Sequence, residues 1–212
     1  MLKVDNYRVQ QLGLVLKNFF PEQTKLAVLT RNFGRLDLVI ANNLANKLAI
    51  SKISYGMLIA YNTVDNTASV LNLLSSGAKV KISKIELIYV PIILPDQLMF
   101  WHQLLELIFY TVPIGLHIPT LFEQICLVGA NLDLFSDSGQ KLLALCRMLN
   151  LLGLCPTNYS NFTPEFRALI YLPIDISVHQ KIDLKWEEAL SRWWRTSMIV
   201  HPKVNLFKTI AY

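Results

Sequence analysis

The chain has 212 residues, of which 53% are hydrophobic and 17% charged, so it can bury a sizeable core and is neither a disordered nor a fibrous protein. Its net charge of +5 is uneven: residues 1–85 hold 11 Lys and Arg against 4 Asp and Glu, residues 86–165 hold 2 against 7, and residues 166–212 hold 7 against 4. A basic first third fits either a surface that binds a polyanion or a solvated face rich in lysine.

The first third of the chain reads as short β-strands separated by turns. Five apolar segments rich in β-branched residues are predicted as strands: Tyr7–Phe19, Lys25–Arg31, Arg35–Ala41, Tyr55–Thr63 and Ala68–Ser75. In the third segment Leu36, Leu38 and Ile40 alternate with Asp37 and Val39, which is the period of a half-buried strand. Five short strands over about 75 residues predict a small closed barrel.

Beyond residue 84 the apolar residues recur at three- and four-residue spacing, which indicates helices. Three runs show this spacing: Leu98, Trp101, Leu105, Ile108 and Val112; then Leu121, Ile125, Val128 and Leu132; then Leu142, Leu145, Met148 and Leu152. Asp96 is expected to cap the first helix, and Thr120 the second, with Glu123 as its capping-box partner. Residues 86–155 are therefore predicted to form a helical bundle.

The tail is mixed. Arg167–Leu172 is an apolar run that fits a short strand, and Asp183–Met198 is predicted as an amphipathic helix docked on the bundle. The predicted fold class is α+β, with a five-stranded OB-fold β-barrel in residues 1–80 and an α-helical domain in residues 81–212.

Composition and motifs argue against membrane insertion, secretion and catalysis. The longest uncharged apolar stretch, Leu107–Phe122, is interrupted by Pro113 and Pro119, and Lys3 and Arg8 precede any apolar run. The protein is therefore expected in the cytoplasm. Its four histidines are scattered, and no H-E-x-x-H, G-x-S-x-G or Walker-type sequence is present, so it is not expected to be an enzyme.

The cysteines predict neither a disulfide scaffold nor a metal site. Cys126, Cys146 and Cys155 form no C-x-x-C pair, and two of them fall within helix-period segments. They are expected to be buried free thiols, and no cofactor is predicted.

Two segments carry a resemblance to a known family. Residues 20–39, FPEQTKLAVLTRNFGRLDLV, resemble the N-terminal barrel of RecO proteins, in which an acidic residue precedes a Lys-led strand ending in Thr, followed by Gly, a basic residue and an apolar strand. Residues 147–153, RMLNLLG, are similar to the Leu-rich helix of that family that ends in Leu-Gly. The order of strands and helices and the chain length agree as well, so the resemblance covers most of the chain.

The resemblance implies a bacterial recombination mediator in DNA repair that works at the nucleoid. Such a protein binds single- and double-stranded DNA, anneals complementary strands, engages the acidic C-terminal tail of single-stranded-DNA-binding protein, and works with RecR to load RecA. Two departures stand out. Residues 41–47, ANNLANK, carry one positive charge where the family usually has a basic stretch, and Cys155 alone stands where many members have a four-cysteine zinc module, so no zinc is expected.

DNA binding by an OB barrel needs cations for the phosphates and aromatic rings for the bases. The candidate residues are Lys17, Lys25, Arg31, Arg35, Lys47, Lys52, Tyr55, Tyr61, Lys79, Lys81 and Lys84. Lys25 and Arg35 are best supported because they match the family motif. Tyr55 and Tyr61 could equally be barrel residues, and the last three lysines could line a DNA path or guard an edge strand against aggregation.

The acidic tail of a partner needs an apolar pocket rimmed by cations. Lys141, Arg147 and Met148 on the third predicted helix are the candidate site, and the alternative is that Arg147 is exposed and idle. The rival to the mediator function is a diverged interaction or scaffold protein that kept the fold and lost most DNA binding. The weakly charged residues 41–47 favour this rival, and the basic first third favours the mediator.

Overall fold

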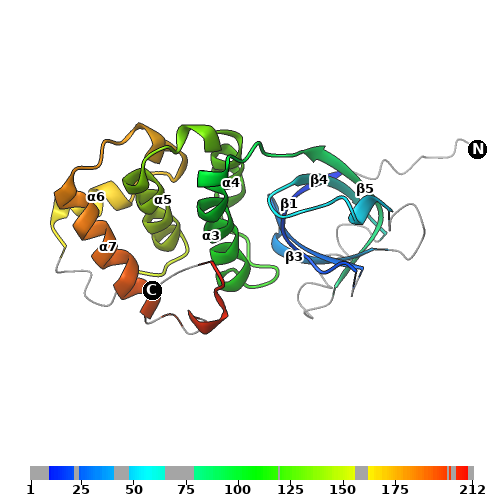
Figure 1. Cartoon of the computed structure of the whole chain (residues 1–212). Coiled ribbons are helices and arrows are strands. Elements are labelled where there is room, and N and C mark those ends of the chain that lie inside the picture. The colour runs from blue at the N-terminus through cyan, green and yellow to red at the C-terminus, as the bar shows by residue number, and fades with distance from the viewer. Residues whose placement is uncertain are drawn as a thin grey trace, which may run out of the picture. The chain divides into compact units, whose positions relative to one another are not determined.

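The computed structural model describes residues 10–21, 24–40, 48–64, 79–118, 120–155, 162–199, 201 and 204–209. Its fold is α+β: a closed five-stranded barrel comes first and helices follow (Figure 1). The strands are β1 (Gln11–Asn18), β2 (Lys25–Thr30), β3 (Gly34–Ile40), β4 (Leu58–Thr63) and β5 (Val80–Tyr89). The α-helices that follow the barrel in the described residues are α3 (Pro95–Thr111), α4 (Leu121–Ala130), α5 (Ser138–Leu151), α6 (Pro164–Ile170) and α7 (Leu184–Ile199), with short 3₁₀ helices η1 (Leu132–Leu134), η3 (Asp175–His179) and η4 (Val204–Leu206).

The barrel has the topology of an OB fold. Its strands pair in the order β1-β2-β3-β5-β4, and β4 returns to β1 to close it. β3 and β5 run parallel, and the other pairs are antiparallel. The prediction of a five-stranded OB-type barrel followed by helices is confirmed.

Alternating side chains of each strand fill the barrel. Leu36, Leu38 and Ile40 of β3 are at most 3% exposed and belong to one core cluster with residues of the other four strands, as their period-two pattern predicted. Arg35, Asp37 and Val39, which alternate with them, face outward; Arg35 and Val39 are half-buried, and Asp37 is 8% exposed. The outer side of β3 therefore presents the polar side chains, and the inner side holds the strand in the barrel.

The fifth strand is not where the sequence analysis placed it. β5 covers Val80–Tyr89, whereas the predicted strand Ala68–Ser75 lies outside the described residues. The predicted start of the helical bundle at residue 86 is also wrong, because residues 86–89 still belong to β5. The reason is a register shift in the pairing of β5 with β4, after which Ile85 rather than residue 84 points into the core. The spacing from Ile82 to Ile85 thus breaks the alternation by which strands are recognised.

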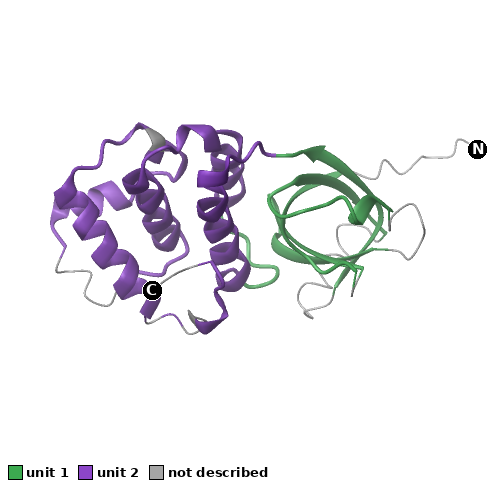
Figure 2. Cartoon of the chain, in the orientation of Figure 1, with its two compact units in different colours: residues 1–90, 113–119 green, residues 91–112, 120–212 purple. Residues whose placement is uncertain are grey.

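The chain divides into two compact units (Figure 2). The barrel unit comprises residues 1–90 and 113–119, and the helical unit comprises residues 91–112 and 120–212. The division falls at residue 90 rather than at the expected residue 80 because β5 completes the barrel. The segment between α3 and α4 belongs to the barrel because the Gly115 N–H donates a 2.8 Å hydrogen bond to the carbonyl oxygen of Arg35.

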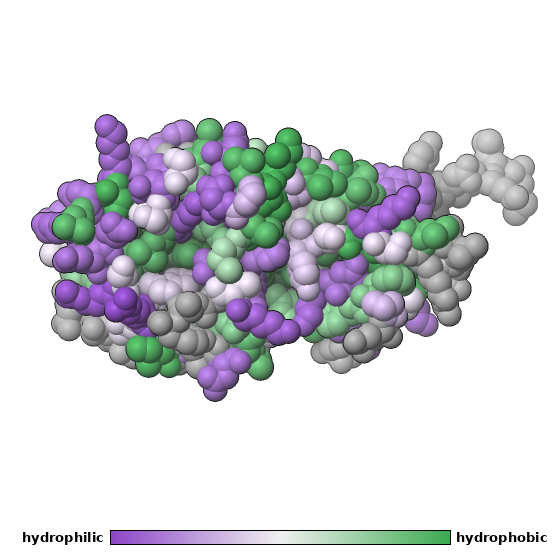
Figure 3. All heavy atoms as spheres, in the orientation of Figure 1, coloured by the Kyte–Doolittle hydropathy of each residue, from purple (hydrophilic) through white to green (hydrophobic). Residues whose placement is uncertain are grey.

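The three predicted helical runs are helices in the structure. In α3 the side chains of Trp101, Leu105 and Ile108 are buried, and in α5 the middle of the helix is buried from residue 143 to residue 149. Leu98 departs from the prediction because it is 44% exposed. It is one of several exposed apolar residues at the start of α3, where Figure 3 shows a hydrophobic area near the top of the view.

The predicted helix caps are wrong. Leu94, not Asp96, occupies the cap position of α3, and its backbone N–H donates to the Gln97 side chain at 3.3 Å. Thr120 stands at the cap position of α4 but has a left-handed backbone, with φ of 67°, and its side chain makes no capping hydrogen bond. Asp137, which was not predicted, caps α5 by accepting hydrogen bonds from two backbone N–H groups.

Both segments of the tail for which an element was predicted are helical. The segment expected as a strand, Arg167–Leu172, mostly belongs to α6, because Pro164 begins a helix whose first turn is capped by the Thr163 hydroxyl. The amphipathic helix predicted at Asp183–Met198 is confirmed as α7. Among the residues that the structure describes, no helix combines the length and the apolar character needed to cross a bilayer.

Candidate nucleic-acid interface

Strand register brings three of the predicted cations to the outer side of the barrel. Lys17 of β1 pairs with Ala27 of β2, Lys25 of β2 pairs with Val39 of β3, and Val39 pairs in turn with Lys81 of β5. Lys25 and Lys81 point outward because their neighbours Leu26, Val80 and Ile82 point into the core. Lys17 points outward because its partner Ala27 lies between two core residues of β2, and paired residues face the same side. Because adjacent strands lie about 4.8 Å apart, Lys25 and Lys81 stand roughly 10 Å apart on one surface.

A carboxylate lies within this group of cations. The Nζ of Lys25 is 2.6 Å from one carboxylate oxygen of Asp37, and a guanidinium nitrogen of Arg35 is 3.8 Å from the other. The side chains of Lys25, Arg35 and Asp37 are only 17%, 14% and 9% exposed. Burial lowers the pKa of Arg35, and the attraction of Asp37 opposes that shift. Asp37 was not predicted as a site residue, and it offsets one of the charges that a phosphate would meet.

An aromatic ring also belongs to this surface. The Nζ atoms of Lys17 and Lys25 lie 5.0 Å and 4.7 Å from the centroid of the Phe19 ring. Such cation–aromatic contacts hold lysine side chains in place at little electrostatic cost. Sequence analysis missed Phe19, although its position two residues after Lys17 put both side chains on one side of an extended chain. We call the surface formed by Lys17, Phe19, Lys25, Arg35 and Lys81 the cationic face.

A turn at residues 50–53 packs against the end of β1 and places two more candidate DNA-binding residues near this face. The Asn18 side-chain amide donates to the carbonyl oxygens of Ile50 and Ile53, at 3.1 Å and 2.7 Å, so this turn is held against the end of β1. Lys52 and Tyr55, within and just after the turn, are exposed. Both stand near the end of the barrel at which β1 ends and β2 begins.

The remaining candidates are spread over other positions. Lys79 is exposed just before β5, Arg31 is exposed in the turn at the far end of β2, and Lys84 forms a salt bridge with Glu86. Lys47 lies outside the described residues. The structure therefore gathers part of the predicted set and disperses the rest.

Tyr61 cannot serve as a stacking platform. Its side chain is 1% exposed inside the barrel, and its hydroxyl donates to the Gln11 side chain at 3.1 Å. Burial raises the pKa of this hydroxyl. The sequence left two interpretations of Tyr61, a stacking residue or a barrel residue, and the second is correct. Its inward position in β4 needs a large side chain to fill the barrel.

The residues proposed to bind the acidic tail of a partner protein do not form a surface site. Arg147 is 1% exposed, and Met148 is fully buried. The Arg147 guanidinium donates to the carbonyl oxygens of Leu169 and Pro173 and to the Ser177 hydroxyl, at distances of 2.9–3.1 Å. Arg147 is therefore neither exposed nor idle but ties α5 to the end of α6 and to the chain that follows it. Burial lowers its pKa to about 10. Lys141 is 3.5 Å from the Asp96 carboxylate.

The cysteines are free, as predicted, but they differ in burial. Cys146 is buried, Cys126 is half-buried, and Cys155 is exposed, which corrects the expectation for Cys155. Cys155 follows the end of α5, where no helix periodicity constrains it. Among the residues that the structure describes, no three His, Cys, Asp or Glu side chains come together as potential metal ligands.

Comparison with known proteins adds no relative to this picture. No family model matches the chain, and no curated protein matches it. The cationic face of the OB-type barrel is therefore the feature on which a functional argument rests.

Proposed function

We propose that the chain is a nucleic-acid-binding protein that acts as a RecO-like mediator in DNA recombination and repair. The observation that carries the proposal is the cationic face, to which three strands contribute Lys17, Lys25 and Lys81. Two of these lysines, Lys17 and Lys25, also lie over the Phe19 ring. Cations beside an aromatic ring on an OB-type barrel suit a single strand, because the cations neutralise phosphates while the ring stacks against a base.

The rest of the proposal follows from the family resemblance. The chain would bind single- and double-stranded DNA in the cytoplasm, and would work with RecR and with the acidic tail of single-stranded-DNA-binding protein, without catalysing a reaction. The OB-type barrel followed by helices supports this assignment. The buried state of Arg147 and Met148 means that a tail would have to bind elsewhere on the chain.

The rival function is a scaffold that kept the fold and lost most DNA binding. One observation favours it: Asp37 pairs with Lys25 and approaches Arg35, so these two cations are partly neutralised before any phosphate arrives. The two functions differ in one measurable property, the salt-dependent affinity for DNA.

The test is fluorescence anisotropy of labelled single-stranded oligo-dT at several salt concentrations. The variant is Lys17→Gln/Lys81→Gln, which removes two charges from the cationic face and leaves the Lys25–Asp37 pair intact. We expect weaker binding and a salt slope smaller by about 1.4, since each phosphate contact on a single strand contributes about 0.7. The matched control is Arg195→Gln/Lys208→Gln, which removes two exposed charges from the helical unit. Equal weakening by both variants, or no binding by the wild type at low salt, would reject the proposal and favour the scaffold.

A further inference from the structure

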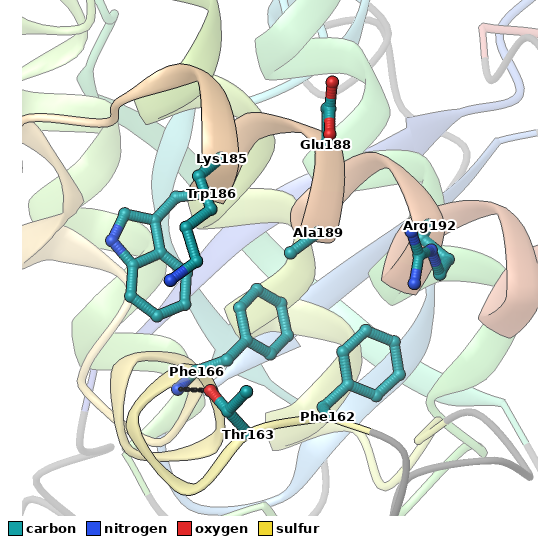
Figure 4. A pocket seen from close by; sticks show the side chains of 8 residues that line it. All are labelled: Phe162, Thr163, Phe166, Lys185, Trp186, Glu188, Ala189 and Arg192. Atoms are coloured by element: carbon teal, nitrogen blue, oxygen red, sulfur yellow. Dashed lines mark hydrogen bonds between the residues drawn. The ribbon is translucent and has the colours of Figure 1, made fainter.

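A pocket of about 220 Å³ lies between α6 and α7 in the helical unit (Figure 4). Phe162, Phe166 and Ala189 line it, and Trp186 stands at one side. Ala189 is the small residue on the α7 side, and a larger side chain at this position would reach into the space. The pocket is therefore open because position 189 of α7 carries only the methyl group of an alanine.

The aromatic rings of the pocket are nearly parallel. The ring planes of Phe162 and Phe166 differ by 22° with centroids 5.0 Å apart, and those of Phe166 and Trp186 differ by 23° with centroids 5.7 Å apart. Offset-parallel rings of this kind are a favourable arrangement for aromatic groups. A flat aromatic ligand could stack onto this series of rings. The side chains would lose little conformational entropy on binding, because their orientations are already fixed.

Cations stand on both sides of the pocket. The Nζ of Lys185 lies 5.5 Å from the centroid of the Trp186 ring, and Arg192 lies at the other side, beside Phe162 (Figure 4). Seven residues separate the two along α7, which corresponds to about 10 Å. Both are exposed, and Glu188, which stands between them along α7 and also lines the pocket, carries the opposite charge. Glu165, outside the pocket lining, also interacts with Lys185.

From this arrangement we infer that the pocket receives one unstacked base of a single-stranded nucleic acid, with Lys185 and Arg192 meeting the phosphates on either side of that base. The inference rests on the proposed function and adds to it a second contact, on the helical unit. A nucleotide within a strand carries a phosphate on each side of its flat base, which matches an aromatic pocket with a cation at each side. The end of a peptide brings its carboxylate to one side only.

A pocket that receives an unstacked base discriminates between single-stranded and duplex DNA. A base in a duplex is stacked and paired, and entering the pocket would require breaking both interactions at a cost of a few kcal/mol. The pocket should therefore add affinity for single strands and none for duplex.

The experiment compares Ala189→Leu with the wild type by anisotropy, using the full chain and both labelled oligo-dT and a labelled duplex of equal length. The leucine fills the pocket without changing the charge. We expect its affinity for oligo-dT to fall at least about fivefold, the loss corresponding to one base stack, and its affinity for the duplex to stay constant. A thermal melt confirms that the variant is folded.

A second pair of variants tests the charges without altering the pocket shape. Arg192→Gln should weaken oligo-dT binding, whereas Arg195→Gln, one turn further along α7 and outside the pocket lining, should not. If Ala189→Leu and Arg192→Gln bind oligo-dT like the wild type while Lys17→Gln/Lys81→Gln is weakened, the pocket inference is wrong and the proposed function stands. If Ala189→Leu instead abolishes binding of an acidic peptide and leaves oligo-dT binding intact, the occupant is a protein tail. Absence of oligo-dT binding by the wild type removes both proposals.

Discussion

Asp37 determines how much positive charge the cationic face can offer to a ligand. Its carboxylate lies between Lys25 and Arg35 and is 9% exposed, so it forms part of the face and is poorly screened by water. A phosphate approaching the face must compete with this carboxylate for the same two cations.

Asp37→Asn should therefore raise the affinity for DNA. The amide keeps the shape of the side chain and releases Lys25 and Arg35, so we expect the dissociation constant for oligo-dT to fall severalfold and the salt slope to rise by up to about 1. The matched control is Glu86→Gln, which makes the same change in net charge at the exposed pair with Lys84. Anisotropy titrations measure both, and an equal gain from the two variants would mean that only the net charge matters.

Single residues show the limit of sequence analysis of the candidate site. The cations of the face could be predicted because they lie in a basic, strand-like stretch, but the positions of Asp37 and Phe19 among them depend on strand register. Arg147 could not be placed from sequence, since an arginine on a leucine-rich helix looks exposed. Its three hydrogen-bond acceptors lie 22–30 residues away along the chain.

At the scale of elements, two helix starts in the helical unit differ in how they are capped. Asp137 accepts hydrogen bonds from the N–H groups of Gly139 and Gln140 at 2.8 Å and 3.1 Å, which satisfies two of the unpaired donors at the start of α5. Thr120, at the start of α4, makes no such bond and holds a left-handed backbone that a β-branched residue disfavours.

The two positions should respond oppositely to loss of their side chains. Asp137→Ala removes a cap and should lower the free energy of unfolding by about 1 kcal/mol. Thr120→Gly relieves backbone strain, so we expect the free energy of unfolding to stay constant or to rise by up to about 1 kcal/mol. Urea unfolding followed by tryptophan fluorescence measures both, because all four tryptophans lie in the helical unit. A loss at Thr120 as large as that at Asp137 would show that the backbone there is unstrained.

Elements with an unbroken period could be predicted from the sequence, and irregular ones could not. β3 and α7 follow periods of two and of 3.6 residues throughout, and both lie where they were expected. β5 contains a register shift, and its apolar run fits either period. α6 has seven residues, two turns, which is too short for helical spacing to outweigh the strand propensity of its apolar residues.

At the scale of the whole molecule, the chain leaves the barrel, begins the helical unit and returns to the barrel before continuing. Residues 113–119 make this return, and Ile114 forms a parallel β-bridge with Arg35. The neighbouring Gly34 has φ of 63°, and a Cβ atom placed on it would lie 1.8 Å from the Leu116 carbonyl oxygen. The close approach of two backbones at Gly34 thus requires a residue without a side chain.

Gly34→Ala should consequently detach the returning segment from the barrel. A backbone oxygen cannot rotate away as a side chain can, so the β2–β3 turn and residues 113–118 must separate, and the Gly115 hydrogen bond to Arg35 is lost. Hydrogen exchange measured by mass spectrometry should show faster exchange in both segments. Gly153→Ala is the matched control, because Gly153 also has a positive φ, of 73°, but has no atom within 4 Å of the added Cβ. It should cost about 1 kcal/mol from backbone strain and leave exchange in the barrel unchanged. If Gly34→Ala exchanges like the wild type at β2, β3 and residues 113–118, the returning segment does not depend on contact with Gly34.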